Sequence, residues 1–182
     1  MRLKGKRVAV LVGPGFEDLE FWVPLMRMQE EGAETTIVGI KAGETTTSKS
    51  GGLTATAQAG AADVSAAQFA GVIVPGGWAP DKLRRYEAVT NLVRDIYQQG
   101  KIVGSICHGG LVLISAGIVE GHRATGSEGI KDDLINAGAS WTYAEAAFRS
   151  DKRPGGGCIV WGRVVPDIPF FCRELVAALS AE

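Results

Sequence analysis

Short apolar runs alternate with longer segments of helical spacing along most of the chain. The apolar runs predict buried β-strands over residues 7–12, 35–40, 70–74, 101–106, 144–149 and 158–161. The longer segments predict helices over residues 16–31, 86–99, 109–116, 130–137 and 167–181. Strands that alternate with helices predict a mostly parallel sheet covered by helices on both faces, which is an α/β fold.

Glycines and polar stretches mark where these elements end. Gly32, Gly100 and Gly138 each follow a helical segment, where glycine commonly ends a helix. The apolar positions that give residues 16–31 their helical spacing are Leu19, Val23, Met26 and Met28. Residues 41–60 are rich in Gly, Thr and Ser and predict a loop with a small hairpin. Residues 152–157 predict a turn between the last two strands.

Composition narrows the class of protein. A length of 182 residues favours one domain over residues 1–182. A net charge of −1 gives no electrostatic footprint for nucleic acid. No apolar run approaches the roughly 18 residues that span a bilayer. The basic N-terminus precedes a short strand-like run and not a signal peptide, so we expect a cytoplasmic protein.

The cysteines and histidines are few. Cys107, Cys158 and Cys172 form no CxxC pair and are odd in number, which argues against a disulfide framework and a zinc site. We expect no metal and no cofactor. Cys158 and Cys172 are interpreted as structural, and His122 as an exposed residue in a loop.

Three loops are expected at the ligand-binding edge of the sheet, outside the carboxyl ends of its strands. They are residues 13–17, 75–81 and 107–110. Residues 13–15 read Gly-Pro-Gly and lack the G-x-G-x-x-G pattern, so a flavin or nucleotide site is the least favoured alternative.

Cys107 has the sequence context of a nucleophile elbow. Ser105 lies two residues before it and Gly109 two residues after it, as a tight strand-to-helix turn requires. The start of the following helix should lower the pKa of the thiol. The alternative is a buried structural cysteine, but the preceding strand and the adjacent His108 favour a reactive one.

Partners for Cys107 are expected on the same edge. The backbone N–H of His108 and an N–H from Gly76, Gly77 or Trp78 are candidate oxyanion donors. Trp78 is also expected to line the pocket.

His108 is the candidate base and needs an orienting acceptor, for which Asp81 and Glu17 are available. The alternative interpretation is that His108 is only a polar residue with satisfied hydrogen bonds at the start of a helix. Glu17 either stabilises a helix N-terminus or, if it points into the shared edge, hydrogen-bonds the sulfur with its own pKa raised by desolvation.

These motifs together resemble the PfpI branch of the ThiJ/PfpI superfamily, which also contains the Parkinsonism-associated deglycase. The resemblance rests on residues 105–109 (Ser-Ile-Cys-His-Gly), 74–81 (Val-Pro-Gly-Gly-Trp-Ala-Pro-Asp), 15–20 (Gly-Phe-Glu-Asp-Leu-Glu), 129–134 (Gly-Ile-Lys-Asp-Asp-Leu) and the Pro-Asp at 166–167. It covers nearly the whole chain.

The resemblance implies a flavodoxin-like three-layer sandwich and a homo-oligomer, either a dimer or a hexamer. It implies Cys107 as nucleophile, His108 as base and Glu17 as the carboxyl partner of the sulfur. The third triad residue would come from a neighbouring subunit, at the position of Asp81.

The chain departs from the family pattern at several positions. Asp81 is one methylene shorter than the Glu often found there. Ser127 and Glu128 replace an aromatic residue and a proline, which would open the pocket wall and add a carboxylate near its mouth. Gly110 replaces a common proline.

Two classes of function follow. The first is a cysteine-dependent hydrolase or glyoxalase-type enzyme that acts on a small carbonyl compound, a peptide or a glycated substrate. The second is an oxidation-sensitive stress-response protein in which Cys107 forms a sulfur oxyacid. The sequence leaves the choice between them open.

Overall fold

A seven-stranded sheet forms the centre of the computed structural model, which describes residues 1–151 and 154–181. Its strands are β1 (Arg7–Leu11), β2 (Glu34–Gly39), β5 (Ala59–Gly60), β6 (Gly71–Val74), β7 (Ile102–Ile106), β10 (Ala147–Ser150) and β11 (Cys158–Gly162). They lie in the order β10-β11-β7-β6-β1-β2-β5. Every pairing is parallel except that of β10 with β11. The predicted mostly parallel sheet is therefore confirmed.

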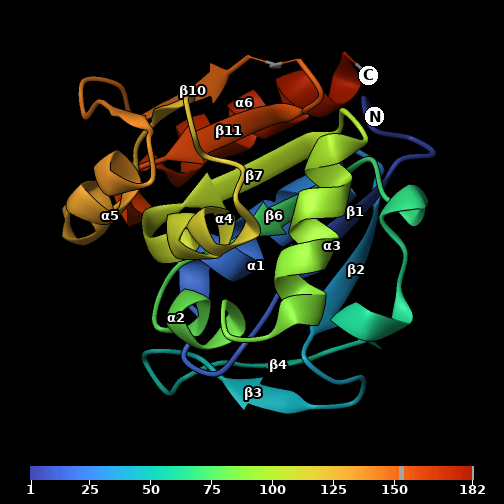
Figure 1. The fold of residues 1–182 in the computed structure, drawn as a ribbon. Helices are drawn as coiled ribbons and strands as arrows, with labels where there is room; N and C mark the ends of the chain where they lie inside the picture. The colour runs from blue at the N-terminus through green and yellow to red at the C-terminus, as the bar shows by residue number, and fades with distance from the viewer. Residues whose placement is uncertain (152–153, 182) are drawn as a thin grey trace.

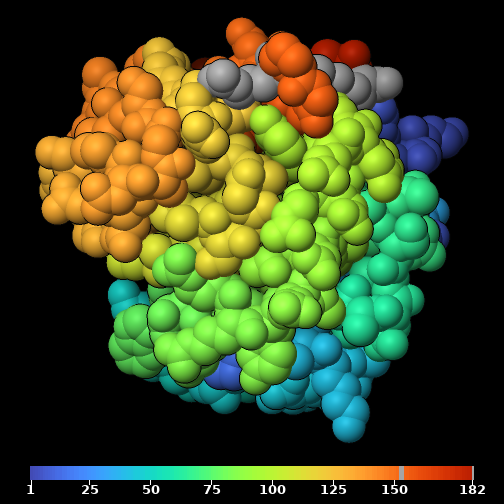
Figure 2. All heavy atoms as spheres, in the orientation of Figure 1, coloured from blue at the N-terminus to red at the C-terminus, as the bar shows by residue number. Residues whose placement is uncertain are grey.

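Helices cover both faces of this sheet (Figure 1). Figure 1 shows α3 (Glu87–Gln98) and α4 (Gly110–Ala116) in front, and α1 (Asp18–Glu30) and α6 (Ile168–Ser180) behind. The smaller helices are α2 (Ala79–Leu83) and α5 (Lys131–Asn136). Figure 2 shows the front face closely covered by side chains of these segments. The arrangement is the flavodoxin-like three-layer sandwich that the family resemblance implies.

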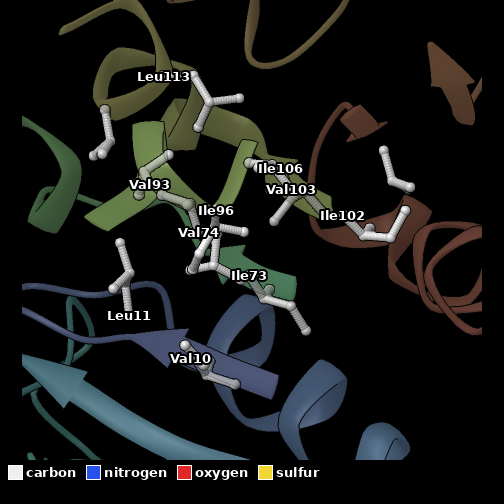
Figure 3. Close-up of a cluster of buried hydrophobic side chains, with 14 of the residues drawn as sticks. Val10, Leu11, Ile73, Val74, Val93, Ile96, Ile102, Val103, Ile106 and Leu113 are labelled. Carbon is white, nitrogen blue, oxygen red and sulfur yellow. The ribbon is translucent and has the colours of Figure 1, made fainter. Parts of the chain in front are cut away.

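The core forms where strand side chains alternate between the two helical layers. β6 and β7 are buried along their whole length, which explains why their sequences are nearly continuous apolar runs. Leu11, Val74 and Val103 lie on the same side of the sheet as the side chains of Val93 and Leu113 (Figure 3). This packing holds β1, β6 and β7 in register, so that the loops after these three strands meet at one edge.

Short elements account for most differences from the predicted pattern. The hairpin expected within residues 41–60 is β3 (Thr45–Thr47) and β4 (Thr54–Thr56). The sequence missed α2, β8 (Arg123–Ala124) and β9 (Ser140–Trp141), which are too short to show a period. The three glycines expected to end helices all have positive φ. Of the predicted 152–157 turn, residues 152 and 153 lie outside the described residues.

The first helix presents a different face to the core than its apolar spacing suggested. Met28 is buried, but Leu19, Val23 and Met26 are 47%, 39% and 57% exposed. The residues that α1 buries are Glu20, Phe21, Pro24, Leu25 and Met28. The apolar stripe on the opposite side of α1 therefore faces outward.

His122 was expected to be exposed and is instead buried, with 1% of its surface accessible. Its Nε2 lies 2.7 Å from the hydroxyl of Tyr97 and its Nδ1 lies 2.8 Å from Oγ of Ser150. The loop that carries His122 packs against α3 and β10. Both ring nitrogens of His122 are therefore hydrogen-bonded to protein groups instead of water. Cys158 and Cys172 are buried as predicted. Within the described ranges, no helix combines the length and apolar character needed to cross a bilayer.

Candidate active site

A cavity of about 630 Å³ lies at the carboxyl ends of β1, β6 and β7. Among the residues that line it are Glu17, Glu20, Lys49, Gly77, Trp78, Asp81, Lys82, Cys107, His108 and Ser127. All three loops predicted to meet at this edge contribute to the cavity wall. Its position is the usual ligand-binding position of an open parallel sheet.

The chain turns sharply at Cys107, between β7 and α4. Cys107 has a φ of +58°, the only positive φ of a non-glycine residue in the described part of the chain. A side chain at Gly109 would place its Cβ 2.3 Å from the carbonyl oxygen of Val74 and 3.0 Å from Oγ of Ser105. Small residues two before and two after the cysteine therefore let the turn pack against the sheet.

The two loops facing Cys107 are joined by backbone hydrogen bonds. The N–H of Glu17 donates to the carbonyl of Gly76 at 3.1 Å, and the N–H of Trp78 donates to that of Gly15 at 2.8 Å. Gly77 has a φ of +81°, and a Cβ there would lie 2.5 Å from the backbone nitrogen of Glu17. Glycine at this position lets the two loops approach closely.

Backbone donors converge on the sulfur of Cys107. The N–H groups of Gly77 and His108 both hydrogen-bond the sulfur, and each acts to lower the thiol pKa. The N–H of Gly76 is used elsewhere, because it donates to Oε2 of Glu20 at 2.9 Å. Of the expected oxyanion donors, Gly77 and His108 direct their N–H groups to the sulfur, and Gly76 donates to the carboxyl group of Glu20 instead.

Glu20 is the carboxyl group beside the sulfur. It is fully buried, and Oε1 has no hydrogen-bond partner among the described residues. A Cβ at Gly76 would lie 2.5 Å from Oε2 of Glu20 and 2.7 Å from Cβ of Cys107, so both side chains crowd this glycine. Burial raises the pKa of Glu20 to about 7, and the charge of Glu17 adds to the increase.

The expectation that Glu17 would be the carboxyl partner of the sulfur is wrong. Oε2 of Glu17 accepts hydrogen bonds from the backbone N–H groups of Leu19, at 2.9 Å, and Glu20, at 2.8 Å. Glu17 therefore caps the N-terminus of α1, which is the alternative interpretation made from the sequence. It lines the cavity but its carboxylate is occupied by the helix.

The expectation that the thiol pKa would fall is also wrong. Burial raises the pKa of Cys107 to about 12, and the charge of Glu20 raises it further. The backbone donors oppose this increase without cancelling it. Because the charge of Glu20 disfavours the thiolate, protonation of Glu20 removes this repulsion.

His108 contacts Cys107 although the two are sequence neighbours. Its Nδ1 lies 3.2 Å from Sγ, because residues 107–109 form a 3₁₀ turn before α4 begins. Burial lowers the pKa of His108, and the charge of Lys49 lowers it further. A neutral imidazole at this position can accept a proton from the thiol.

No orienting acceptor for His108 lies among the residues that the structure describes. Its Nε2 has no hydrogen-bond partner among the described residues; a Cβ at Gly129 would lie 3.4 Å away from it. Asp81 lines the same cavity, but its carboxylate pairs with Arg85 one turn further along the chain. Asp81 and His108 thus share the cavity without contact.

The remaining expected residues differ in whether they line the cavity. Trp78 lines the cavity and is 59% exposed. Ser127 lines it too, whereas the exposed Glu128 lies outside the lining. Gly109 lies beneath the turn and not in the cavity wall. Within residues 1–151 and 154–181, no three His, Cys, Asp or Glu side chains are grouped so as to hold a metal ion.

Sequence reasoning missed Glu20 and Lys49. A signal for Glu20 was present: it lies in the helical stripe that contains Phe21, Pro24 and Leu25, where a carboxylate is out of place unless it has a role. Lys49 lies in the loop of the β3–β4 hairpin, and only the folded structure brings it to the cavity.

Known proteins share both the sequence and the fold. A deglycase of Pyrococcus abyssi is 37% identical over 174 residues, which cover 96% of this chain and 99% of that protein. Protein/nucleic acid deglycase 2 of Escherichia coli and general stress protein 18 of Bacillus subtilis are each 34% identical over 176 residues, covering 97% of this chain and 99% of theirs.

Solved structures agree with this relationship. A protein of Anabaena variabilis with DJ-1/ThiJ/PfpI-like and ferritin-like domains gives a TM-score of 0.89 at 33% identity, over 96% of this chain. The chain spans 48% of that two-domain protein. Drosophila melanogaster DJ-1beta gives a TM-score of 0.85 at 21% identity, over 97% of this chain and 91% of its own, and so shows the shared fold alone. Residues 6–178 match the DJ-1/PfpI family, and the chain belongs to that family.

Proposed function

We propose that the chain is a cysteine-dependent enzyme that acts on carbonyl adducts, with Cys107 as nucleophile and His108 as base. The observation that carries this proposal is the environment of one sulfur atom. It receives two backbone N–H groups, lies 3.2 Å from Nδ1 of His108 and borders a cavity. Such convergence is what attack on a carbonyl group requires.

The first step forms a carbon–sulfur bond. The thiol proton passes to Nδ1 of His108, Sγ adds to the carbonyl carbon, and the π electron pair of the C=O bond moves to its oxygen. The N–H groups of Gly77 and His108 stabilise the resulting oxyanion. With an aldehyde carbon the product is a hemithioacetal on Cys107. In a thiol adduct R–S–CH(OH)–CO–CH₃ the hydroxyl proton first passes to the sulfur of R–S, and the C–S bond breaks to give R–SH and the free aldehyde carbon within the cavity, to which Sγ then adds.

The later steps need only water when the substrate is an adduct of a 2-oxoaldehyde. His108 moves the C–H proton of the attacked carbon to the adjacent carbonyl carbon, which leaves a thioester on Cys107 that water hydrolyses. For a thiol adduct the sum is R–S–CH(OH)–CO–CH₃ plus H₂O giving R–SH plus lactic acid. One carbon is oxidised and its neighbour reduced, so no external oxidant takes part.

Two observations favour an adduct as substrate. Several relatives bear the name deglycase, among them those of Pyrococcus abyssi and Escherichia coli. The cavity, at about 630 Å³, is also large for a three-carbon aldehyde alone and lies within the usual range for larger ligands. Peptidase action at the same site is the other hydrolytic form, and a relative in Bacillus subtilis is named a putative cysteine protease.

The test measures turnover of methylglyoxal, its thiol and amine adducts, and a peptide panel by the wild type and by Cys107→Ser. We expect Cys107→Ser to lose turnover by at least about 10³-fold. Cys172→Ala is the matched control, since Cys172 is buried in α6 away from the cavity. If no substrate shows turnover that depends on Cys107, the enzymatic proposal is wrong.

A second function is favoured by Glu20. Its unpartnered Oε1 and raised pKa supply a protonated carboxyl group that can donate a hydrogen bond to an oxidised sulfur. One molecule of peroxide converts the thiol to sulfenic acid with release of water, and a second gives sulfinic acid. Intact-mass measurement after mild peroxide tests this: Cys107 should oxidise before Cys158 and Cys172, and equal oxidation of all three would rule it out.

We also propose that the protein is a cytoplasmic homo-oligomer with a site completed between subunits. The outward-facing Leu19, Val23 and Met26 support self-association through α1. Nε2 of His108 has no partner in residues 1–151 and 154–181, which supports a contribution from Asp81 of a second copy. Sedimentation velocity of the wild type and of Met26→Glu tests the first point, and a monomeric wild type would contradict both.

A further inference from the structure

The charged groups around the cavity differ in whether they already have a partner. The carboxylate of Glu17 accepts two backbone N–H groups, and that of Asp81 pairs with Arg85. Lys49 and Lys82 also line the cavity, and neither forms an ion pair in the described part of the chain. The two lysines that line the cavity are therefore free to pair with an anionic group, although the carboxylate of Glu17, which caps α1, also lines the cavity without a counter-ion in the described part of the chain.

Hydrogen bonds fix the loop of the β3–β4 hairpin, which carries Lys49, to the segment at the start of α1. Its backbone N–H donates to the carbonyl of Phe16 at 2.8 Å, and the N–H of Gly15 donates to the carbonyl of Thr47 at 2.9 Å. The next residue, Ser50, donates to the carboxylate of Asp18 through both its hydroxyl and its N–H. The hairpin is thus fastened on both sides of Lys49 to the loop that precedes α1.

The charge of Lys49 acts on the groups beside the sulfur. Its charge affects the pKa of both Glu20 and His108, although burial is the larger cause at each. The charge of Lys82 affects neither of them. Together with its backbone anchor beside Phe16, this effect makes Lys49 the candidate cation for an anionic group bound near the sulfur.

We propose that the site selects carbonyl adducts that carry an anionic group, such as a carboxylate, and that Lys49 binds this group. The inference deepens the proposed function and rests on it, because it concerns the substrate on which Cys107 acts. An anion bound at Lys49 places the attached carbonyl near Sγ. The volume of the cavity leaves room for both parts of such a molecule. Since the contact is made equally in the bound substrate and the transition state, it should act on KM more than on kcat.

The experiment compares two hemithioacetals of methylglyoxal that differ in one group. One is made with N-acetylcysteine, which carries a carboxylate, and the other with N-acetylcysteine amide, which is neutral. For the wild type we expect kcat/KM to be about 5-fold higher for the carboxylate adduct, the size of a partly exposed charge contact. Raising the salt concentration should reduce this preference.

Variants test whether Lys49 causes the preference for the carboxylate adduct. Lys49→Gln should bring the ratio of the two kcat/KM values close to 1, mainly through a higher KM for the carboxylate adduct. Lys49→Arg should keep most of the preference, and Lys82→Gln should reduce it less. Lys41→Gln removes an exposed lysine before the same hairpin but outside this cavity, and should leave both values unchanged.

The possible outcomes distinguish failure of the anion-binding role of Lys49 from failure of the proposed enzymatic function. Equal kcat/KM values in the wild type, as expected if the enzyme takes only the free aldehyde released by both adducts, overturn the inference and leave the proposed function intact. A preference that survives in Lys49→Gln overturns it as well. Loss of all turnover that depends on Cys107 overturns the proposed function and this inference with it.

Discussion

The two histidines of the chain lie in polar clusters that differ in how fully their hydrogen bonds are satisfied. At His122, one ring nitrogen contacts Tyr97 and the other contacts Ser150, and the side chain is buried. At His108, one ring nitrogen contacts the sulfur of Cys107 and the other has no partner among the described residues. The cavity at the carboxyl ends of β1, β6 and β7 is lined by His108 and not by His122.

This difference separates a structural cluster from a reactive one. A buried network with each member paired holds its elements together, here α3, the loop at His122 and β10. Around Cys107, the orphan Oε1 of Glu20 and the unpaired Nε2 of His108 leave capacity for a proton, a substrate or a second subunit. Hydrogen-bond satisfaction therefore distinguishes the two sites better than burial or residue type.

Exchanging the two histidines for alanine is the strongest test of this contrast. His108→Ala should reduce kcat/KM by about 10³-fold or more and change the free energy of unfolding by less than about 1 kcal/mol. His122→Ala should lower the free energy of unfolding by about 3 kcal/mol, through a cavity and two unpaired groups, and leave kcat/KM unchanged. Urea denaturation and steady-state kinetics measure both. The reverse pattern would refute the distinction.

Gly76→Ala should damage the reactive cluster without removing any titratable group. The new Cβ would lie 2.5 Å from Oε2 of Glu20 and 2.9 Å from the backbone nitrogen of His108, so the turn must shift. We expect kcat/KM to fall by about 10²-fold, because displacement of about 1 Å is costly at a reacting centre. Gly52→Ala is the control, since a Cβ there has a single ordinary contact, 3.4 Å from Oγ of Ser50. Equal activity in both variants would mean that close packing at Gly76 is dispensable.

Glu20→Gln should make the stability of the protein less dependent on pH. The pKa of Glu20 is about 7 in the folded state and ordinarily 4.5, so between these values the folded state holds a proton that the unfolded state has released. The free energy of unfolding therefore falls as pH rises through this window. Glutamine mimics the protonated group and cannot ionise.

The full pKa difference corresponds to at most about 3 kcal/mol, and we expect Glu20→Gln to be about 2 kcal/mol more stable than the wild type at pH 8. At pH 5 the two should differ little. Urea denaturation between pH 5 and pH 8 measures the difference, with the exposed Glu44→Gln as control. Parallel pH profiles for the wild type and Glu20→Gln would show that Glu20 is ionised throughout.

The parts of the fold predicted from sequence are those set by local signals. The strands before the cavity are apolar runs, and the turn at Cys107 is marked by small residues on both sides. The rotation of α1 about its axis has no such signal. Leu19, Val23 and Met26 form a regular apolar stripe, yet with about 100° per residue this stripe lies opposite the buried face.

The sequence pattern predicted the wrong buried face for α1, and this is why it also predicted the wrong carboxylate, Glu17, as the partner of the Cys107 sulfur. Glu20 points inward only once Phe21 and Leu25 are known to face the sheet, and Glu17 then lies at the end of the helix as its cap. The His122 cluster could not be predicted for a different reason. Its members come from segments about 25 and 28 residues apart, and long-range pairing of polar groups leaves no periodic trace in sequence.

Tyr97→Phe is the mildest test and isolates one hydrogen bond of the satisfied cluster. It removes the hydroxyl that lies 2.7 Å from Nε2 of His122 and keeps the ring. We expect a loss of about 1 kcal/mol in the free energy of unfolding, measured in urea, and no change in the alkylation rate of Cys107. Tyr86→Phe, at an exposed tyrosine, should cost nothing measurable. A slower or faster reaction at Cys107 in Tyr97→Phe would show that the two clusters are coupled, and the reactive site would then depend on hydrogen bonds well beyond its own cavity.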